Sequence, residues 1–451
     1  MNSCLVNNPW RAGTLEMGPK RVTVGILGLG TVGTGVLRLL DGNGDRVAQA
    51  AGVRVEVAGV AVRDVHKPRV VTPAPGLLKG DPGAVVNDPG VDLVVEVMGG
   101  LEPAGAWVLR ALELGKPVVT ANKELVASRG RELLDAAFRH RTRLRFEASV
   151  GGGIPIIAAL GDSLAGNRVG QIIGILNGTT NYILSRMTSD GVEFPAALAE
   201  AQARGYAESD PGADVSGQDA ACKIAILASV AFGVHVPAAE VPREGIAGIT
   251  SRDVACAREL GCVIKLLASA KEEGGTVRAR VFPALLPLDH PLAAVTGVFN
   301  AVWVTGDAVG ETMFYGQGAG QLPTASAVVG DIIASARELA RGGVFHPLLV
   351  WDRPKPAQAP GPSEAAFYFR MLVSEQPGAL AAAVSVLGDQ EVALARFTSR
   401  GRGQGGTEWV LVTQPVEEQR LKDALCIIQG LPAVKQVGNA IRILDAPSGC
   451  G

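Results

Sequence analysis

The chain has 451 residues, carries 42 Lys and Arg against 44 Asp and Glu, and has a formal net charge of −2 at pH 7. This near balance, without a long run of basic residues, argues against a nucleic-acid-binding protein and against one held on an anionic membrane. Hydrophobic residues make up 47% of the chain, so it can bury large cores, and at roughly 100–200 residues per domain we expect two to four domains.

The chain shows no sign of a membrane span or a secretory signal. No apolar run reaches the roughly 18 residues that a spanning helix needs, and residues 1–20 lack an apolar core. The six cysteines form no C-x-x-C pair and are too sparse for a disulfide scaffold. We therefore expect a cytoplasmic protein with an N-terminal extension over 1–20. Residues 1–16 of it are either an upstream start-site extension ahead of Met17 or a short disordered arm.

Residues 21–150 alternate between segments typical of strands and segments typical of helices. Strands are expected over 22–27, 53–62, 92–97, 117–120 and 144–149, and helices over 31–40, 103–114 and 123–140. Several of the strands are β-branched on both faces, which is typical of a parallel sheet covered by helices on both sides. The pattern predicts a doubly wound α/β domain of the Rossmann type.

The pattern changes after residue 150. Residues 151–305 mix both element types, with a long helix after Ser216 and a strand near 277–282, and we expect a substrate domain here. The Pro-rich stretch over 351–363 predicts a semi-rigid linker. Residues 364–445 then run strand, helix, strand, strand, helix, strand, which predicts a small α+β unit of the βαββαβ kind.

The string G-x-G-x-x-G, at Gly28, Gly30 and Gly33, follows the first expected strand and opens the first expected helix. In that context Gly28 allows a tight turn, Gly30 lets the backbone approach a pyrophosphate, and Gly33 seats the helix on the strand. The helix N-terminus adds N–H donors and a positive dipole end. The string predicts a dinucleotide site; the alternative is an ordinary strand-to-helix turn.

The second expected strand ends in Arg63 and Asp64. A carboxylate at this point binds the ribose 2′-hydroxyl of NAD, whereas an Arg accommodates the 2′-phosphate of NADP. Arg63, with Lys67 close behind it, favours NADP, and Asp64 leaves NAD open. The alternative for Arg63 is a solvated loop charge.

Lys123 lies in TANKELVA (120–127), at the carboxyl end of an expected strand, where open α/β sheets place ligands. A partly desolvated Lys can titrate near neutrality and carry protons. The alternative is a solvent-exposed Lys in a turn.

The segment 205–227 leads into an apolar helix and is rich in charge. Its charged residues include Glu208, Asp210, Asp214, Asp219 and Lys223. Asp219 and Lys223 are four residues apart, so on a helix they share a face, and the preceding carboxylates suit a substrate ammonium. A divalent metal site is one alternative, although the spacing does not follow a calcium-binding loop. The other is a capped, charged helix start.

Seven segments together resemble homoserine dehydrogenase. They are GLGTVG (28–33), VVEVMGGLEPA (94–104), VTANKELVA (119–127), FEASVGGGIPII (146–157), GILNGTTNYIL (174–184), the segment 205–227 and GETMFYGQGAGQLPTASAV (310–328). The resemblance covers residues 21–445, with the motifs in the same order, and the unit over 364–445 is similar to the ACT module of many single-function members. The aspartokinase domain of fused members has no counterpart here.

The resemblance implies a reversible hydride transfer between L-homoserine and L-aspartate 4-semialdehyde, a step toward threonine, methionine and isoleucine. It implies that Lys223 and Lys123 line the reacting centre and that Asp219 orients Lys223, and it leaves open which lysine is the acid. It places four residues around the substrate: Glu208 and Asp214 at the amino end, with Thr179 and Tyr206 nearby.

The resemblance also implies domain roles and bound groups. Residues 21–150 would bind the dinucleotide, 151–305 would bind substrate and form a homodimer or homotetramer, and 306–350 would return to the first domain. The residues expected to line the cofactor are Gly28, Gly30, Thr31, Val32, Gly33, Arg63, Lys67, Gly99, Thr120, Lys123 and Gly318. A structural monovalent cation, expected to be sodium, is implied at the Glu147 carboxylate and the carbonyls of Val150, Gly152 and Ile154.

The ACT-like unit departs from the family pattern at Glu375, where members often carry Asp, and in a Gly-rich loop over 400–406. Such units pair across a dimer and bind an amino acid, here L-threonine as a feedback inhibitor; the alternative is a domain that only supports assembly.

For the whole chain, the alternatives are another Rossmann amino-acid or semialdehyde dehydrogenase, and a non-catalytic amino-acid sensor. A phosphorylating semialdehyde dehydrogenase needs a thiolate, and Cys222 is expected to point away from the face that Asp219 and Lys223 share. A set of four intact residues argues against loss of catalysis: Lys123, Glu208, Asp219 and Lys223.

Overall fold

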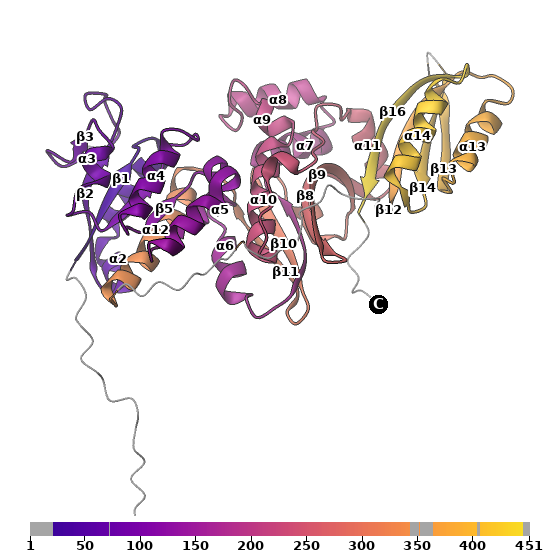
Figure 1. Cartoon of the computed structure of the whole chain (residues 1–451). Coiled ribbons are helices and arrows are strands. Elements are labelled where there is room, and N and C mark those ends of the chain that lie inside the picture. The colour runs from indigo at the N-terminus through magenta and orange to yellow at the C-terminus, as the bar shows by residue number, and fades with distance from the viewer. Residues whose placement is uncertain (1–20, 72, 343–350, 352–363, 404–405, 445–451) are drawn as a thin grey trace, which may run out of the picture. The chain divides into compact units, whose positions relative to one another are not determined.

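The computed structural model describes residues 21–71, 73–342, 351, 364–403 and 406–444. The chain forms two compact units, one from Met1–Ser149 with Gly320–Leu348 and the other from Val150–Ala319 with Leu349–Gly451. Figure 1 labels most of their elements. The expected N-terminal extension lies outside the described residues, as does the expected linker apart from Trp351.

The first unit is built on a six-stranded parallel sheet with the strand order β3-β2-β1-β4-β5-β6. Its strands are β1 (Arg21–Leu27), β2 (Arg54–Ala61), β3 (Leu78–Lys79), β4 (Leu93–Glu96), β5 (Val118–Thr120) and β6 (Leu144–Arg145). Its helices are α1 (Thr31–Gly42), α2 (Gly44–Ala51), α3 (Gly83–Val86), α4 (Ala104–Glu113), α5 (Lys123–Arg139) and α12 (Gln321–Ala340). This is the doubly wound order of Rossmann domains, so the expected fold class is confirmed.

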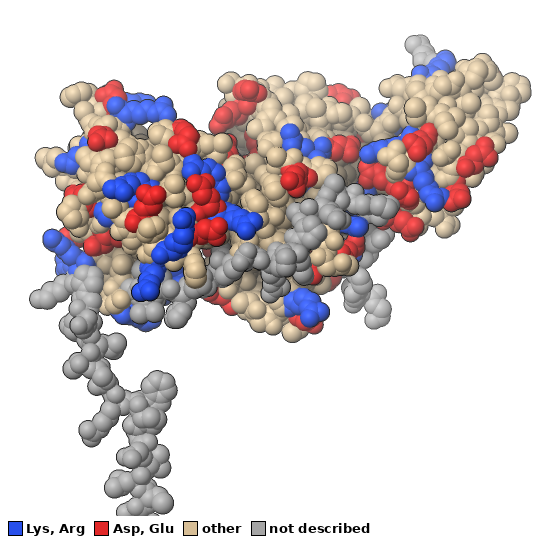
Figure 2. All heavy atoms as spheres, in the orientation of Figure 1, with Lys and Arg blue, Asp and Glu red and all other residues tan. Residues whose placement is uncertain are grey.

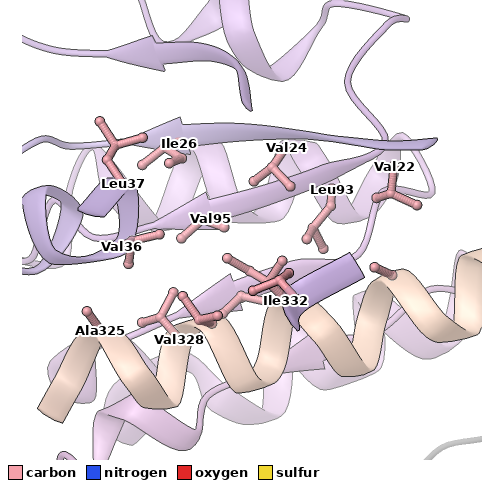
Figure 3. Close-up of a cluster of buried hydrophobic side chains, with 14 of the residues drawn as sticks. Val22, Val24, Ile26, Val36, Leu37, Leu93, Val95, Ala325, Val328 and Ile332 are labelled. Atoms are coloured by element: carbon pink, nitrogen blue, oxygen red, sulfur yellow. The ribbon is translucent and has the colours of Figure 1, made fainter. Parts of the chain in front are cut away.

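The core of the first unit joins segments that lie far apart in the chain. Figure 3 shows buried side chains of β1 and β4 packed against α12: Val22, Val24, Ile26, Leu93, Val95, Ala325, Val328 and Ile332. Gly35 of α1 allows α12 to come close, because a Cβ there would lie 2.7 Å from the Gln321 carbonyl oxygen. Since each fully buried Val or Leu stabilises a fold by about 1.5–3 kcal/mol, α12 is an integral part of this domain.

The strand expected over 144–149 ends at Arg145, and Glu147–Ser149 form a 3₁₀ turn instead. The backbone N–H of Glu147 donates to Asp331 Oδ2 over 2.9 Å, and Ser149 Oγ donates to the Phe146 carbonyl over 2.6 Å. These bonds satisfy backbone groups that a sheet ladder would otherwise pair. The chain therefore leaves the sheet earlier than its apolar pattern predicts.

The second unit contains a ten-stranded sheet that runs β11-β10-β7-β8-β9-β16-β12-β14-β13, with β15 paired to β12. Its first part supplies β7 (Val169–Ile175), β8 (Cys262–Glu273), β9 (Thr276–Pro287), β10 (Phe299–Gly306) and β11 (Gly310–Gln317). The helices here are α6 (Ile156–Ala158), α7 (Gly178–Asp190), α8 (Phe194–Ala203), α9 (Gly212–Val215), α10 (Gln218–Phe232) and α11 (Ser251–Glu259). The helix expected after Ser216 is α10, which is almost wholly buried against β7, β8 and β9.

The C-terminal part has the expected βαββαβ order. Its elements are β12 (Glu364–Val373), α13 (Ala379–Asp389), β13 (Leu394–Gly403), β14 (Gly406–Thr413), the short β15 (Val416–Glu417), α14 (Glu418–Gln429) and β16 (Val434–Ile443). Because β13 runs to Gly403, much of the expected Gly-rich loop is strand, and residues 404–405 lie outside the described ones. β16 pairs in parallel with β9 through Arg442↔Ala284 and Ile443↔Leu285, so the strands of the C-terminal part continue the sheet of β7–β11.

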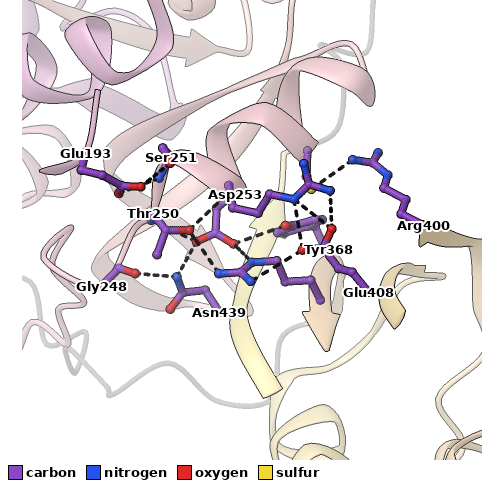
Figure 4. Close-up of polar contacts among 12 residues, drawn as sticks. Glu193, Gly248, Thr250, Ser251, Asp253, Tyr368, Arg400, Glu408 and Asn439 are labelled. Atoms are coloured by element: carbon purple, nitrogen blue, oxygen red, sulfur yellow. Dashed lines mark hydrogen bonds and ion pairs between the residues drawn. The ribbon is translucent and has the colours of Figure 1, made fainter. Parts of the chain in front are cut away.

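A buried ionic cluster also ties α11 to the C-terminal strands (Figure 4). The Asp253 carboxylate, fully buried, accepts bonds from Arg370 Nε over 2.6 Å and from Asn439 Nδ2 over 2.8 Å. It also accepts bonds from Thr250 Oγ1 over 2.7 Å and from the Tyr368 hydroxyl over 3.3 Å. Burial alone would raise the pKa of Asp253, but the bonds from Arg370 and Thr250 hold it below its usual range.

The surface carries both signs of charge. Figure 2 shows Lys and Arg side chains interspersed with Asp and Glu on the displayed face of each unit. On α5, for example, Arg129 pairs with Glu102 and Glu132, both over 2.7 Å. Within the described part of the chain, no helix combines the length and the apolar character needed to cross a membrane.

Candidate active site

The turn between β1 and α1 contains the three glycines of the dinucleotide string. Gly28 has a φ of +102°, and a Cβ there would lie 2.7 Å from the Val97 carbonyl oxygen. A Cβ on Gly33 would lie 2.4 Å from the Gly28 carbonyl oxygen, so glycine lets α1 seat closely on the turn. Gly30, before α1, has no atom beyond its own chain neighbours within 4 Å of the place where its Cβ would be. The N-terminus of α1, where Thr31 and Val32 follow, therefore faces open space in this unit.

The carboxyl ends of β4 and β5 form a second wall of this region. The Glu96 carboxylate, fully buried, accepts the backbone N–H groups of Met98 over 2.7 Å and Gly99 over 3.1 Å. It also accepts the Thr120 hydroxyl over 2.6 Å. Gly99 has a φ of +76°, a left-handed conformation that glycine adopts without strain. One buried carboxylate thus holds the loop after β4 to the end of β5.

Lys123 is the first residue of α5 and is half-buried. Asn122 caps this helix by accepting the Leu125 N–H over 3.1 Å, and its Nδ2 donates to the Gly100 carbonyl over 2.6 Å. Sequence reasoning named neither Glu96 nor Asn122. Each carried a signal, since Glu96 is a charged residue in an apolar strand and Asn precedes a helix start.

The segment after β2 holds the residues expected to discriminate between NADP and NAD. Arg63 and Lys67 are exposed. Arg69 donates to the backbone carbonyls of Asp64 and, over 2.7 Å, of Lys67, which folds the loop back on itself. Within the described part of the chain, the Arg63 guanidinium has no hydrogen bond or ion pair.

In the second unit, α10 brings Asp219 and Lys223 together as their spacing predicts. Lys223 Nζ donates to Asp219 Oδ2 over 2.7 Å and to the Leu176 carbonyl, at the end of β7, also over 2.7 Å. Both side chains are buried. No described residue accepts the third N–H of Lys223, so one proton of this ammonium remains for another partner.

Asn177, which the sequence reasoning missed, connects Asp214 to Asp219. Its Nδ2 donates to Asp214 Oδ1 over 2.7 Å and to Asp219 Oδ2 over 2.8 Å. Asp214 lies on α9 and is partly exposed. The turn after β7 therefore holds Asp214, Asp219 and Lys223 as one cluster.

The remaining predicted substrate residues lie along α7 and the segment after α8. Thr179 Oγ1 donates to the Tyr206 carbonyl over 2.7 Å, and the Tyr206 ring lies 5.0 Å from that of Tyr182. Glu208 is exposed, and no described residue makes a hydrogen bond or ion pair with its carboxylate. Among the described residues no group of three or more His, Cys, Asp or Glu is arranged to hold a metal ion, including this acid-rich segment.

The residues expected around a monovalent cation are divided between the two units, with Glu147 in the first and the other three in the second. Glu147 is buried beside Asp331, and burial together with the Glu147 charge raises the pKa of Asp331 to about 7. In the second unit, Val150, Gly152 and Ile154 belong to a tight turn in which the Ile154 N–H donates to the Gly151 carbonyl. A Cβ on Gly152 would lie 2.6 Å from the Gly318 carbonyl carbon, so these two glycines touch.

Two family models match the chain. The homoserine dehydrogenase model matches residues 155–333, and the model of the homoserine dehydrogenase NAD-binding domain matches residues 28–147. The homoserine dehydrogenase of Synechocystis sp. is 46% identical over 434 residues, which cover 94% of this chain and all (100%) of that protein. That of Corynebacterium glutamicum is 43% identical over 427 residues, 94% of this chain and 95% of that protein.

Solved structures agree with these matches. The homoserine dehydrogenase of Thiobacillus denitrificans superposes with a TM-score of 0.89 at 40% identity, covering 95% of this chain and 99% of that one. A mutant of a hyperthermophilic archaeal homoserine dehydrogenase, solved with NADPH, superposes with a TM-score of 0.60 at 29% identity over 70% of this chain and 97% of that one. Fold, motif order and near-complete coverage coincide, and the chain belongs to the homoserine dehydrogenase family.

Proposed function

We propose that Lys223 carries the hydroxyl proton in the interconversion of L-homoserine and L-aspartate 4-semialdehyde, the reaction of this oxidoreductase. The support is its hydrogen bonding: the Leu176 carbonyl and Asp219 fix two of its three N–H bonds. In the reduction, the third donates to the oxygen that becomes the hydroxyl, and in the oxidation a neutral Lys223 accepts that proton. When bound, the nicotinamide supplies the hydride or accepts it at the same carbon. Lys123, at the start of α5, is proposed as the second lysine of the centre.

The substrate ammonium is proposed to bind Asp214 and Glu208. Asp214 Oδ1 is bonded to Asn177, whereas no described residue donates to its Oδ2. The Glu208 carboxylate is likewise free of protein partners within the described residues. Thr179 and Tyr206, joined by a hydrogen bond, lie on the neighbouring elements and would border the substrate.

The cofactor is proposed to be NADP. Gly28 and Gly33 support the pyrophosphate site because they let α1 sit closely on the turn, and Gly30 supports it because its open side leaves room for a ligand. Arg63 with Lys67 would meet the 2′-phosphate. The solved NADPH complex of an archaeal relative is consistent with this preference. The other residues proposed to line the dinucleotide are Thr31, Val32, Gly99, Thr120, Lys123 and Gly318.

Two further groups are proposed. Sodium would bind the Glu147 carboxylate and the carbonyls of Val150, Gly152 and Ile154, since hard cations take oxygen ligands. L-Threonine would bind the βαββαβ unit as a feedback inhibitor in a homodimer or homotetramer. The exposed turn with Glu375 precedes Gly378, whose left-handed conformation (φ +85°) starts α13.

A spectrophotometric assay tests these assignments. The protein is mixed with L-homoserine and either NADP⁺ or NAD⁺, with and without L-threonine and sodium, and the absorbance of the reduced nicotinamide is followed. We expect turnover with a higher kcat/KM for NADP⁺ that L-threonine lowers. Equal or better use of NAD⁺ would contradict the cofactor proposal, and indifference to L-threonine would leave the βαββαβ unit as an assembly domain.

A further inference from the structure

Asn177 has all the hydrogen-bonding capacity of its amide in use. It is buried at the junction of β7 and α7, where its Oδ1 accepts the Thr180 N–H over 2.8 Å and the Thr180 hydroxyl over 2.9 Å. Its two Nδ2 hydrogens go to Asp214 and Asp219. Since an Asn side chain has two acceptor sites and two donors, the amide is fully satisfied and its orientation is determined.

The oxygen and the NH₂ group of the Asn177 amide have different roles. The oxygen caps α7, which is the ordinary role of an Asn at a helix start. The NH₂ group bridges two carboxylates that lie on different elements, Asp214 on α9 and Asp219 on α10. Capping needs only the oxygen, so it does not account for the two donated bonds.

A neutral donor is the group that suits this position electrostatically. Asp214 and Asp219 carry like charges, and a shared donor between them offsets their repulsion. A cationic side chain would neutralise Asp214 and compete with a substrate ammonium, whereas a carboxylate at this place would add a third negative charge. With an amide at this position, the cluster of Asp214, Asp219 and Lys223 keeps one net negative charge, which the ammonium of the substrate can neutralise.

We propose that Asn177 is a positioning residue. It holds Asp214, which is proposed to bind the substrate ammonium, at a fixed position relative to Asp219 and Lys223. This inference rests on the proposed roles of Asp214 and Lys223. Asp219 Oδ2 accepts from Asn177 and from Lys223 at once, so one chain of hydrogen bonds runs from Asp214 through Asn177 and Asp219 to Lys223. Asp214 and Lys223 are thereby held at a fixed separation, which matches the separation between the ammonium and the reacting oxygen of the bound substrate.

The test uses Asn177→Ser, because Ser also caps a helix by accepting the Thr180 N–H but cannot bridge two carboxylates. We expect the variant to melt within a few degrees of the unmodified enzyme. Its kcat/KM for L-homoserine should fall at least about tenfold, through both a lower kcat and a higher KM for homoserine, because Asp214 and Asp219 are then no longer held by a shared donor. The KM for the dinucleotide should stay within about twofold, a split that general damage to the fold would not produce.

Two further variants make the test specific. Thr180→Val removes the hydroxyl on the capping side only, and we expect it to keep kcat/KM within about threefold. In a double-mutant cycle, Asn177→Ser combined with Asp214→Ala should lose much less than the product of the two single losses, because both changes break the same link.

The proposal is overturned if Asn177→Ser stays within about twofold in kcat/KM, if Thr180→Val loses as much, or if the two losses multiply independently. Turnover of homoserine by the unmodified enzyme, measured first, tests the proposed function by itself. The ratio of variant to unmodified enzyme tests Asn177 alone.

Discussion

Replacing Arg370 by Met should measure how strongly the buried cluster of Figure 4 stabilises the C-terminal unit. The substitution leaves the Asp253 carboxylate, which has 0% exposure, without its cationic partner. Removing one member of a buried ion pair costs about 3–5 kcal/mol. Because Thr250 and Asn439 still donate to the carboxylate over 2.7 and 2.8 Å, we expect a loss near the lower end, about 3 kcal/mol.

The pH dependence of this loss has a definite sign. In the unmodified enzyme the pKa of Asp253 is lowered, so its stabilisation is present above the usual Asp range and is lost as the pH falls through the still lower folded pKa. Without Arg370, burial is opposed by fewer donors, so this carboxyl protonates at a higher pH. The deficit of Arg370→Met should therefore be largest near pH 7 and shrink as the pH falls toward 4.

The matched control is Arg252→Met. Arg252 pairs with Glu408, but its side chain is 44% exposed, so its loss should cost at most about 1 kcal/mol. Hydrogen exchange of the β12 and α11 amides, followed by mass spectrometry across this pH range, gives the local opening free energy of both variants. A deficit below about 1 kcal/mol for Arg370→Met, or one that grows toward acid, would refute the reasoning.

Three further predictions concern catalysis and the cofactor. Lys223→Ala should fold but lose about 10²–10⁴-fold in kcat, which is the usual contribution of a proton-transfer group. Lys265 is another buried lysine of the second unit, and Lys265→Met should keep most turnover. Comparable losses of kcat in the two variants would contradict the role of Lys223. Arg63→Ala should raise the KM for NADP more than that for NAD, and equal effects in steady-state assays would make Arg63 a bystander. Glu96→Gln keeps only one acceptor oxygen, so its NH₂ group must face either the Met98 and Gly99 N–H groups or the Thr120 hydroxyl. We expect the KM for the dinucleotide to rise at least about fivefold while the KM for homoserine stays within about twofold; an unchanged dinucleotide KM would show that the loop holds without this carboxylate.

The fold could be predicted wherever its determinants are local. The glycine string follows a strand and opens a helix, and the alternation of β-branched strands with helices specifies the doubly wound sheet. The end of the strand at Arg145 could not be predicted in this way. It depends on Asp331, which accepts the Glu147 N–H from a helix 184 residues further along the chain.

In the candidate site, too, the contacts between residues close in sequence could be predicted, and those between distant residues could not. Asp219 and Lys223 are four residues apart, so helical geometry alone pairs them. Asn177 contacts carboxylates that are 37 and 42 residues away. Its sequence signal, an Asn before a helix start, predicts a cap and gives no indication of the bridge. Lys223 also donates to the backbone carbonyl of Leu176. Every residue has such a carbonyl, so the sequence gives no indication of this contact.

The return of α12 to the first sheet has a consequence for synthesis of the chain. The side chains of β1 and β4 that Ala325, Val328 and Ile332 cover are translated roughly 230–310 residues earlier than their partners. Until Gln321–Ala340 has left the ribosome, Val22, Val24 and Leu93 have no permanent cover. The nascent dinucleotide-binding domain must therefore wait for nearly the whole catalytic region before it can close. A fragment that stops at Ser149 should therefore expose this face and aggregate.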